Sequence, residues 1–526
     1  MVVDERALVV ARRAAEQALA AGVDLPDHLS LWRLAGGRPA AEPVSGRPEE
    51  LGDLLEESFS PEARRERGAH YTPELLATEL ADRALAGYQR PQVGDPACGG
   101  GALLLAVARH LARRGEDPLD VVARLWGMDA DAMAVATTEV ALTLWAGTPP
   151  PAGNLLVADA LLDPVPWPPL DVVVGNPPFL SQLDAGTSRT ATTSARLRAR
   201  FGGAVRAYTD TASLFLLAAC DLVAPGGTVA LLQPQSVLAA RDAGAVRDAV
   251  ASRGHLVDVW VPPSPGFAAA VEVCVPIIEV GAPRSMQSWS GHLARANGVP
   301  AVELGVHRTL ADEATTTAGF RSEYYGMVDH VHEQVDCPAG APLVTTGLVD
   351  LGDCAWGDRP ARIGRRSWER PVVDVVALEG RAADWVRRTG GPKLMVATQT
   401  RVVEVVVDDT GQWIPGVPLV VALAPPERLW PLAAALASPG VTAWLLQQVA
   451  GTALTPHALK VTAALVREVP LPTNEAAWED GTTAFRRGDL QLFADAMTTA
   501  YGTSAEVGDW WIKWAKLVWS PPRLHQ

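Results

Sequence analysis

The sequence predicts an α/β chain in which a doubly wound sheet follows a short helical leader and precedes an α+β domain. Between about 90 and 280, apolar strand-like runs alternate with helix-like stretches, which is typical of a largely parallel sheet covered on both faces. From about 285 onward, loops rich in Gly, Pro and Arg separate short strands. The length of 526 residues is too great for one ordinary domain and allows about two to four.

Residues 1–62 are predicted to form the helical leader. Apolar residues recur there at helical spacing, in Ala7, Val10, Ala11 and Ala14. The segment holds 12 acidic residues and 6 arginines, a net charge of −6. We interpret it as a small helical cap on the next domain, and a surface for docking a partner is the alternative.

Residues 63–284 are predicted to form the doubly wound domain. Ligands bind such sheets at the carboxyl ends of the strands, so residues that directly follow a strand are the first functional candidates. The expected strands lie at 123–128, 171–174, 228–232, 256–261 and 271–280, and the expected helices at 101–114, 130–146, 209–224 and 239–253.

Residues 285–475 are predicted to form the α+β domain, followed by a helical tail at 476–526. Short strands are expected in VVALEG, LMVAT and RVVEVVVDD, before a helical pattern returns at 428–450. The tail carries five Trp, which favour core packing and leave a partner interface as the alternative.

The composition excludes several classes of protein. A hydrophobic content of 48% excludes global disorder, and the five Cys contain no CxxC pair, which excludes a zinc ribbon and favours a reducing compartment. No uncharged apolar run reaches about 18 residues, and the N-terminus lacks a signal-peptide layout. We therefore predict a cytoplasmic protein without membrane span or metal. The net charge of −15 argues against a surface that grips nucleic acid throughout.

The motif DPACGGG, from Asp95 to Gly101, lies between a short strand at Val93 and a helix that starts near Leu103. Glycines let the backbone turn tightly and approach a ligand closely, and the helix N-terminus behind them offers free N–H groups. The motif is neither GxGxxG nor a P-loop. By itself such a turn indicates a ligand site without specifying the ligand.

The strongest signal is GNPPF, from Gly175 to Phe179, which directly follows the apolar run DVVV. Its two prolines fix the backbone and remove N–H donors, so the carbonyls and the Asn176 amide oxygen form a cluster of acceptors. Such a cluster suits a planar amine with two N–H donors, and Phe179 adds a flat apolar face. The alternative is a plain strand-end turn.

With both motifs present, the chain resembles the S-adenosylmethionine-dependent amino-group DNA methyltransferases, in particular the N6-adenine group with the gamma-type motif order. The resemblance covers roughly 65–280, and more loosely 320–472, where FRSEYYGMV and LKVTAALVREVPLP are similar to target-recognition domains. It implies a Rossmann-like methyltransferase fold with a C-terminal recognition domain. Asn rather than Ser at the start of the catalytic motif favours adenine N6 over cytosine N4.

The resemblance also implies which residues bind the cofactor. GAHYTPELL matches the family motif that lines the methionine end of the cofactor. Asp129 would hold the ribose hydroxyls, and Asp159 would contact the adenine amine; the alternatives are a helix N-cap and a loop acid, respectively. The expected cofactor-binding residues are Tyr71, Thr72, Pro73, Asp95, Ala97, Cys98, Gly99, Gly101, Asp129 and Asp159.

Catalysis is expected from Asn176, Pro177, Pro178 and Phe179. The exocyclic amine of adenine is a poor nucleophile because its lone pair is delocalised into the ring. Acceptors at the Asn176 amide and the Pro177 carbonyl would draw its protons toward tetrahedral geometry and localise that lone pair. The target base must first be flipped out of the duplex. Phe179 and Phe267 are expected to stack on it, an ordinary core Phe being the alternative for Phe267.

Two Arg-rich segments are predicted to contact double-stranded DNA. The first segment, residues 185–209, follows the catalytic motif and contains no acidic residue. Its arginines are expected to contact phosphates, and the alternative interpretation is a solvated helix face. The second interleaves Arg with Trp356 and Trp368, as suits groove or backbone contact. The arginines are Arg189, Arg196, Arg198, Arg200 and Arg206 in the first segment and Arg359, Arg362, Arg365, Arg366 and Arg370 in the second.

The predicted function is site-specific methylation of adenine N6 in DNA, in a restriction-modification or phage-defence system. The alternatives are a modification subunit that depends on a protein partner, methylation of RNA or of a protein glutamine, and a non-catalytic DNA-binding assembly subunit. A fused nuclease is not expected, because no convincing Asp…Glu-x-Lys set occurs. The acidic excess is largest in the leader, expected to lie away from the cleft, so non-specific DNA affinity should be weak and salt-dependent.

Overall fold

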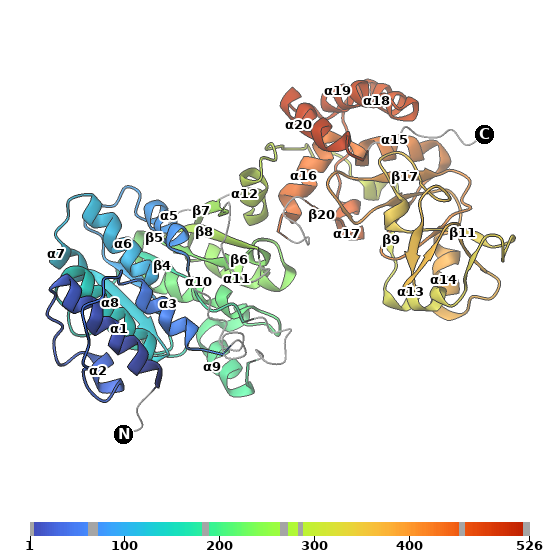
Figure 1. Cartoon of the computed structure of the whole chain (residues 1–526). Coiled ribbons are helices and arrows are strands. Elements are labelled where there is room, and N and C mark those ends of the chain that lie inside the picture. The colour runs from blue at the N-terminus through green and yellow to red at the C-terminus, as the bar shows by residue number, and fades with distance from the viewer. Residues whose placement is uncertain are drawn as a thin grey trace. The chain divides into compact units, whose positions relative to one another are not determined.

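A computed structural model describes residues 5–60, 72–180, 189–262, 272–281, 288–451 and 458–518. The chain divides into two compact units, Met1–Trp289 and Ser290–Gln526, and each is described by itself (Figure 1). The predicted leader lies within the first unit, and the predicted tail within the second. The finer boundaries at 62, 284 and 475 stay predictions.

The first unit is built on a mixed, mainly parallel eight-stranded sheet, which confirms the predicted fold class. The strand order is β3-β2-β1-β4-β5-β8-β6, with β7 also paired to β8. Strands β1 to β5 run parallel, whereas β8 is antiparallel to its neighbours β5 and β7. The strands are β1 (Val93–Asp95), β2 (Leu125–Asp129), β3 (Leu155–Val157), β4 (Leu170–Gly175), β5 (Val223–Leu231), β6 (Gln233–Pro234), β7 (Gly254–Trp260) and β8 (Val273–Val280).

The strand order reverses between β1 and β4, and this reversal decides where a ligand can bind. Successive connections leave the sheet in opposite directions at that point, which opens a crevice at the carboxyl ends of the strands. Val172, Val173 and Val174 of β4 are fully buried, as expected for a short β-branched strand covered on both faces. Residues 176–179, which follow β4, therefore leave a buried strand and enter the crevice.

Seven helices connect or flank these strands within the described residues. Three of them begin at an Asp whose carboxylate accepts a hydrogen bond from a backbone N–H: Asp117 caps α7, Asp131 caps α8 and Asp210 caps α10. The helices are α5 (Glu74–Ala84), α6 (Ala102–Arg113), α7 (Pro118–Val122), α8 (Ala132–Ala146), α9 (Ala191–Phe201), α10 (Thr211–Leu222) and α11 (Gly244–Ala251).

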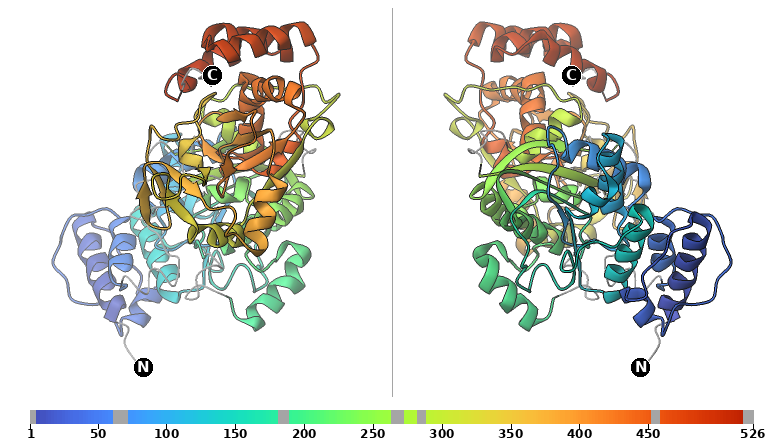
Figure 2. Two further views of the ribbon diagram at one scale, coloured as in Figure 1. Left: turned by 90° about the vertical axis from the view of Figure 1, so that its right-hand side faces the viewer. Right: turned by 90° about the vertical axis from the view of Figure 1, so that its left-hand side faces the viewer.

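Over residues 5–60 the leader forms three helices, α1 (Glu5–Ala21), α2 (Ser30–Leu34) and α3 (Glu50–Glu57). All three pack against α8, and Figure 2 shows the blue leader helices side by side at one edge of the first unit. The predicted apolar face of α1 is fully buried and belongs to the same hydrophobic core as the sheet. This packing supports the interpretation of the leader as a helical cap.

Within the described residues, the second unit contains two four-stranded sheets and two two-stranded sheets. One sheet has the order β10-β14-β11-β18 and the other β17-β15-β19-β9, while β12 pairs with β13 and β16 with β20. The strands are β9 (Thr315–Ala318), β10 (Val331–Glu333), β11 (Ala341–Val344), β12 (Ala361–Ile363), β13 (Arg366–Trp368), β14 (Pro371–Val373), β15 (Lys393–Val396), β16 (Gln399–Thr400), β17 (Val405–Asp408), β18 (Ile414–Pro415), β19 (Val420–Leu423) and β20 (Leu459–Lys460).

Helices complete the second unit, and its last three pack together around buried aromatic side chains. Trp478, Phe485, Phe493 and Trp511 are all buried there, which is the core packing that the tail composition favours. The helices are α12 (Trp289–Ala296), α13 (Arg321–Val328), α14 (Gly380–Arg388), α15 (Pro426–Ala437), α16 (Pro439–Val449), α17 (Ala463–Arg467), α18 (Glu475–Arg487), α19 (Leu490–Tyr501) and α20 (Ala505–Ala515).

Two details of the second unit differ from the predicted elements. The stretch VVALEG is not a strand: β14 ends at Val373, and Val376 lies in the following loop with 92% of its surface exposed. The helical pattern at 428–450 is two helices, because Ser438 ends α15 and its side chain caps α16. In both places the residues are apolar as expected, but the chain turns where the sequence predicts a continuous element.

Within the described residues, no single helix is long and apolar enough to span a membrane; only α15 and α16 taken together reach that length, and they meet at a bend of 60°. Among the same residues, no group of three His, Cys, Asp or Glu side chains is placed to hold a metal ion.

Candidate active site

A cavity of about 560 Å³ lies at the carboxyl ends of β1, β2 and β4 in the first unit. This volume falls within the range of small-molecule sites, about 300–1,000 Å³. Its lining combines an apolar floor with four carboxylic acids. The lining residues are Gly52, Leu55, Glu56, Phe59, Thr72, Asp95, Ala97, Cys98, Gly99, Gly100, Ala102, Leu103, Asp129, Ala130, Asp131, Ala132, Ala134, Asn176 and Pro178.

The glycine turn forms one wall of the cavity. Gly99 and Gly101 adopt left-handed backbone conformations, with φ of 53° and 89°, which side chains other than glycine rarely tolerate. The turn closes through a hydrogen bond from the Gly101 N–H to the Cys98 carbonyl, 2.9 Å long, and Gly101 then begins α6. The sequence DPACGGG therefore forms the tight turn predicted from it.

Asp129 links the end of β2 to this turn. One carboxylate oxygen accepts a hydrogen bond from the Gly99 N–H at 3.0 Å, and the other accepts from the Asp131 N–H at 2.9 Å. The N-cap of α8 is thus Asp131 rather than Asp129, for which a helix N-cap was the alternative interpretation of the sequence. Both acids line the cavity, which leaves Asp129 compatible with the ribose-binding role that its strand-end position predicts.

Asp95 is the most deeply buried acid of the cavity, with 1% of its surface exposed. Burial raises the pKa of Asp95 to about 7, and the charge of Asp129 adds to the increase, whereas a hydrogen bond from the Ala97 N–H opposes it. A Cβ atom added to Gly175 would lie 3.1 Å from the Asp95 carboxylate. Asp95 therefore lies beside the start of the GNPPF motif.

Asn176 is oriented by Thr72. The Asn176 amide donates a hydrogen bond through Nδ2 to the Thr72 hydroxyl at 3.0 Å, and both side chains line the cavity. Because Nδ2 donates to Thr72, the amide oxygen, which is an acceptor by type, is directed away from that hydroxyl. Pro178 also lines the cavity, Pro177 is buried, and Phe179 is half-buried against the hydrophobic core.

Some predicted site residues are absent from the cavity lining, and two others cannot be placed. The Asp159 carboxylate accepts a hydrogen bond from the Leu161 N–H at 2.9 Å, and Asp159 is not among the residues that line the cavity. Pro73 is the N-cap of α5 and is likewise absent from the lining. Tyr71 and Phe267 fall outside the described residues.

The leader also contributes to this cavity, contrary to the expectation from sequence. Gly52, Leu55, Glu56 and Phe59, from α3 and the residues after it, form part of the lining. The expectation that the acidic leader lies away from the cleft is therefore wrong. The helical spacing of its apolar residues signalled a buried face, but no local signal says what that face covers.

In the first Arg segment Arg189 is half-buried, whereas the other four arginines are exposed. Arg189 donates to the Thr209 carbonyl, and Arg200 donates to the Ala160 carbonyl at 2.6 Å. Arg196 forms an exposed ion pair with Asp163 at 3.4 Å, whereas Arg198 and Arg206 are exposed. Burial lowers the pKa of Arg189 and of Arg200.

The second Arg segment forms a hairpin in the second unit. Gly364 and Arg365 occupy a two-residue turn with positive φ at both positions, as the primed hairpin turns require. Arg362, Arg365 and Arg366 are exposed on this hairpin, Arg370 lies over Trp356, and Arg359 pairs with Asp350 at 2.8 Å. The hairpin therefore presents three exposed cations on a narrow β-ribbon.

Residues 49–286 match the model of the N-6 DNA Methylase family. The matched segment begins at α3 and ends after β8, so it includes the whole cavity. It also begins within the leader rather than at the first cofactor motif.

Two relatives illustrate the similarity. The chain is 24% identical over 216 residues to the type II methyltransferase M.BanIII of Aneurinibacillus aneurinilyticus, a match that covers 37% of this chain and 35% of that protein. The chain thus matches only about a third of that relative's length. The chain is also similar to the solved structure of the type IIL restriction-modification enzyme MmeI in complex with DNA. The match covers 93% of this chain and 83% of the MmeI chain, with a TM-score of 0.52 and 15% sequence identity. That likeness shows the fold.

Proposed function

We propose that this chain is an S-adenosylmethionine-dependent DNA methyltransferase that modifies adenine N6 within a restriction-modification system. The observation that carries the proposal is the position of Asn176 and its prolines at the end of β4, on a cavity bounded by a glycine turn and strand-end acids. The family match over residues 49–286 and the similarity to a type II methyltransferase support the reaction class.

The cavity fits S-adenosylmethionine in size and in charge. Glu56, Asp95, Asp129 and Asp131 all line it, and the cofactor carries a sulfonium and an ammonium group. Asp129 would hold the ribose hydroxyls, and the glycine turn lets the chain approach the cofactor closely. When bound, the cofactor supplies an electrophilic methyl group.

The residues of this chain then position and activate the target amine. The Asn176 amide oxygen and the Pro177 carbonyl would accept hydrogen bonds from its two N–H groups, and this localises the nitrogen lone pair away from the ring. Once the nitrogen has gained the methyl group, it would lose one of these two protons to water. Thr72 fixes the orientation in which the amide oxygen, rather than Nδ2, faces the amine. No general base of shifted pKa is needed, because alignment and electrostatics carry the step.

The hairpin of the second unit is the proposed DNA contact. A two-stranded ribbon fits the major groove, and Arg is the residue most often used there to recognise guanine. Arg362, Arg365 and Arg366 would contact bases or phosphates from it. Arg198 and Arg196 would contribute phosphate contacts, whereas the partly buried hydrogen bonds of Arg189 and Arg200 to backbone carbonyls favour a structural role for those two.

The proposal is tested with purified protein, labelled S-adenosylmethionine and DNA of mixed sequence, followed by digestion to nucleosides. N6-methyladenine is the expected labelled product. Label found only in N4-methylcytosine would overturn the choice of base. Label found only when tRNA or a protein replaces DNA would overturn the choice of substrate, and Asp129→Ala should remove label in every case by weakening cofactor binding.

The affinity for S-adenosylmethionine is expected to rise between about pH 6 and pH 7.5. Below its pKa of about 7, Asp95 carries a proton, and a cationic ligand binds more tightly once that proton has left. Each binding event therefore releases up to one proton, so the dissociation constant falls by as much as about tenfold per pH unit below the pKa and levels off above it. Calorimetric titration across this range measures the effect. Asp95→Asn is the control that should flatten the profile, and an unchanged slope in it would assign the effect to another group.

A further inference from the structure

The leader helix α3 lies directly against the glycine turn. A Cβ atom added to Gly100 would lie 2.4 Å from the Gly52 Cα, so the two backbones touch with no room for a side chain. Gly100 is not among the glycines with positive φ, so this close approach, rather than backbone strain, accounts for glycine at that position. The leader is therefore fitted to the turn that forms the cavity wall.

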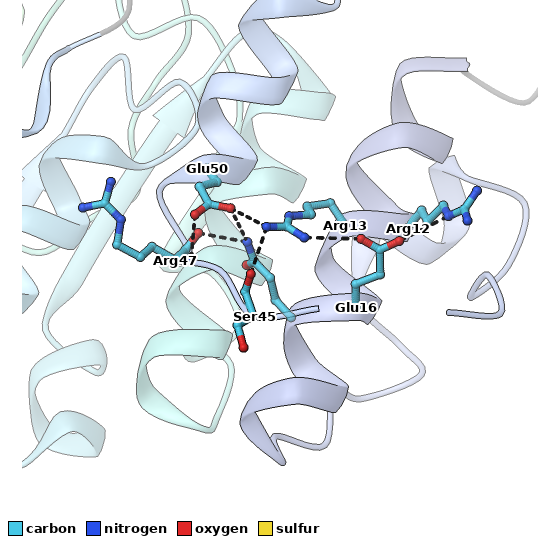
Figure 3. Close-up of polar contacts among 7 residues, drawn as sticks. Arg12, Arg13, Glu16, Ser45, Arg47 and Glu50 are labelled. Carbon is cyan, nitrogen blue, oxygen red and sulfur yellow. Dashed lines mark hydrogen bonds and ion pairs between the residues drawn. The ribbon is translucent and has the colours of Figure 1, made fainter. Parts of the chain in front are cut away.

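Polar contacts hold α3 in this position from two sides. Glu49, at its N-terminus, makes two hydrogen bonds to the Arg109 guanidinium of α6, at 2.6 and 2.8 Å. On the other side Glu50 accepts from Arg13 of α1 at 2.7 Å, in the network that Figure 3 shows. Leu51 and Leu55 of the same helix are buried in the core. These contacts hold α3 in place as one side of the cavity.

The apolar part of this wall faces the end of the cavity at β2. Leu55 and Phe59 both line the cavity. The Arg6 guanidinium lies 5.0 Å from the centre of the Phe59 ring and 3.4 Å from the Asp131 carboxylate, so Phe59 is adjacent to the start of α8. Asp129, two residues before Asp131, holds the position at which a doubly wound sheet binds a ribose.

We propose that the leader is part of the cofactor site, with Leu55 and Phe59 forming the apolar face that receives the nucleoside of S-adenosylmethionine. This inference rests on the proposed function. A flat purine ring gains from contact with an aromatic ring and from removal of apolar surface from water.

The test measures binding of S-adenosylmethionine and S-adenosylhomocysteine to the full chain by calorimetry. Phe59→Ala is expected to weaken both ligands about tenfold, and equally, because both carry the same nucleoside. Leu19→Ala is the matched control: it truncates an apolar leader residue that is 50% exposed, and both affinities should stay at the wild-type value. Wild-type affinities in Phe59→Ala would overturn the inference, as would an equal loss in Leu19→Ala.

A second measurement needs no variant. Saturating S-adenosylmethionine should slow backbone hydrogen exchange in α3, and leave α11 of the same unit, which does not line the cavity, unchanged. Unchanged exchange in α3 would overturn the inference even if Phe59→Ala fails to fold. If the wild-type chain binds neither ligand, the proposed function fails instead, which distinguishes the two results.

Discussion

Replacing Asn176 with alanine should lower the rate of methyl transfer to adenine by about 10²–10³-fold while S-adenosylmethionine still binds. The substitution removes one of the two acceptors placed to hold the target amine, and loss of one preorganised hydrogen-bonding group at a reacting centre has an effect of this size. Single-turnover transfer to DNA and calorimetric titration of the cofactor measure the two quantities separately. An unchanged rate would remove Asn176 from the mechanism.

Thr72 provides the control that separates orientation of the amide from its presence. Thr72→Val keeps the shape of the side chain but deletes the hydroxyl that accepts from Asn176 Nδ2. Without it the amide is free to turn, so transfer should slow while cofactor affinity changes little, and Thr72→Ser should restore the rate. Equal losses of rate and affinity in Thr72→Val would instead place Thr72 on the cofactor, the role that the sequence resemblance implies.

Replacing Lys393 with methionine should destabilise the second unit by roughly 3–5 kcal/mol, the usual effect of removing one partner of a buried ion pair. Lys393 and Asp408 lie opposite each other on β15 and β17, with 0% and 1% of their side chains exposed and 2.6 Å between Nζ and Oδ2. The substitution leaves the Asp408 carboxylate buried without its cation.

Calorimetric unfolding of the full chain measures this loss. Lys460→Met removes an exposed lysine from β20 and should leave unfolding unchanged. S-adenosylmethionine affinity should also stay unchanged in Lys393→Met, because the cavity lies wholly in the first unit, whereas transfer to DNA should fall if the second unit supplies recognition. A Lys393→Met chain as stable as the wild type would show that the ion pair contributes nothing net.

Elements with strong local signals could be predicted from sequence. The strand DVVV and the motif GNPPF lie together because β-branched residues favour a buried strand and the prolines end it. The glycine turn follows from backbone freedom that only Gly99 and Gly101 supply. By contrast, VVALEG has a strand-like composition, yet its valines lie in the loop after β14. A segment forms a strand only where another strand is placed to pair with it, and that depends on parts of the chain far away in sequence.

The sequence by itself determined the α/β class, the tight glycine turn after β1 and the position of Asn176 and its prolines at the end of β4, since these depend on residues close together in the chain. Only the tertiary structure decided that the acidic leader forms a wall of the cavity, that Thr72 orients Asn176 across 104 positions of sequence, and that Asp159 is held in a loop away from the lining. Such contacts depend on which faces of distant elements pack together. Helical spacing shows that a face is buried but not against what.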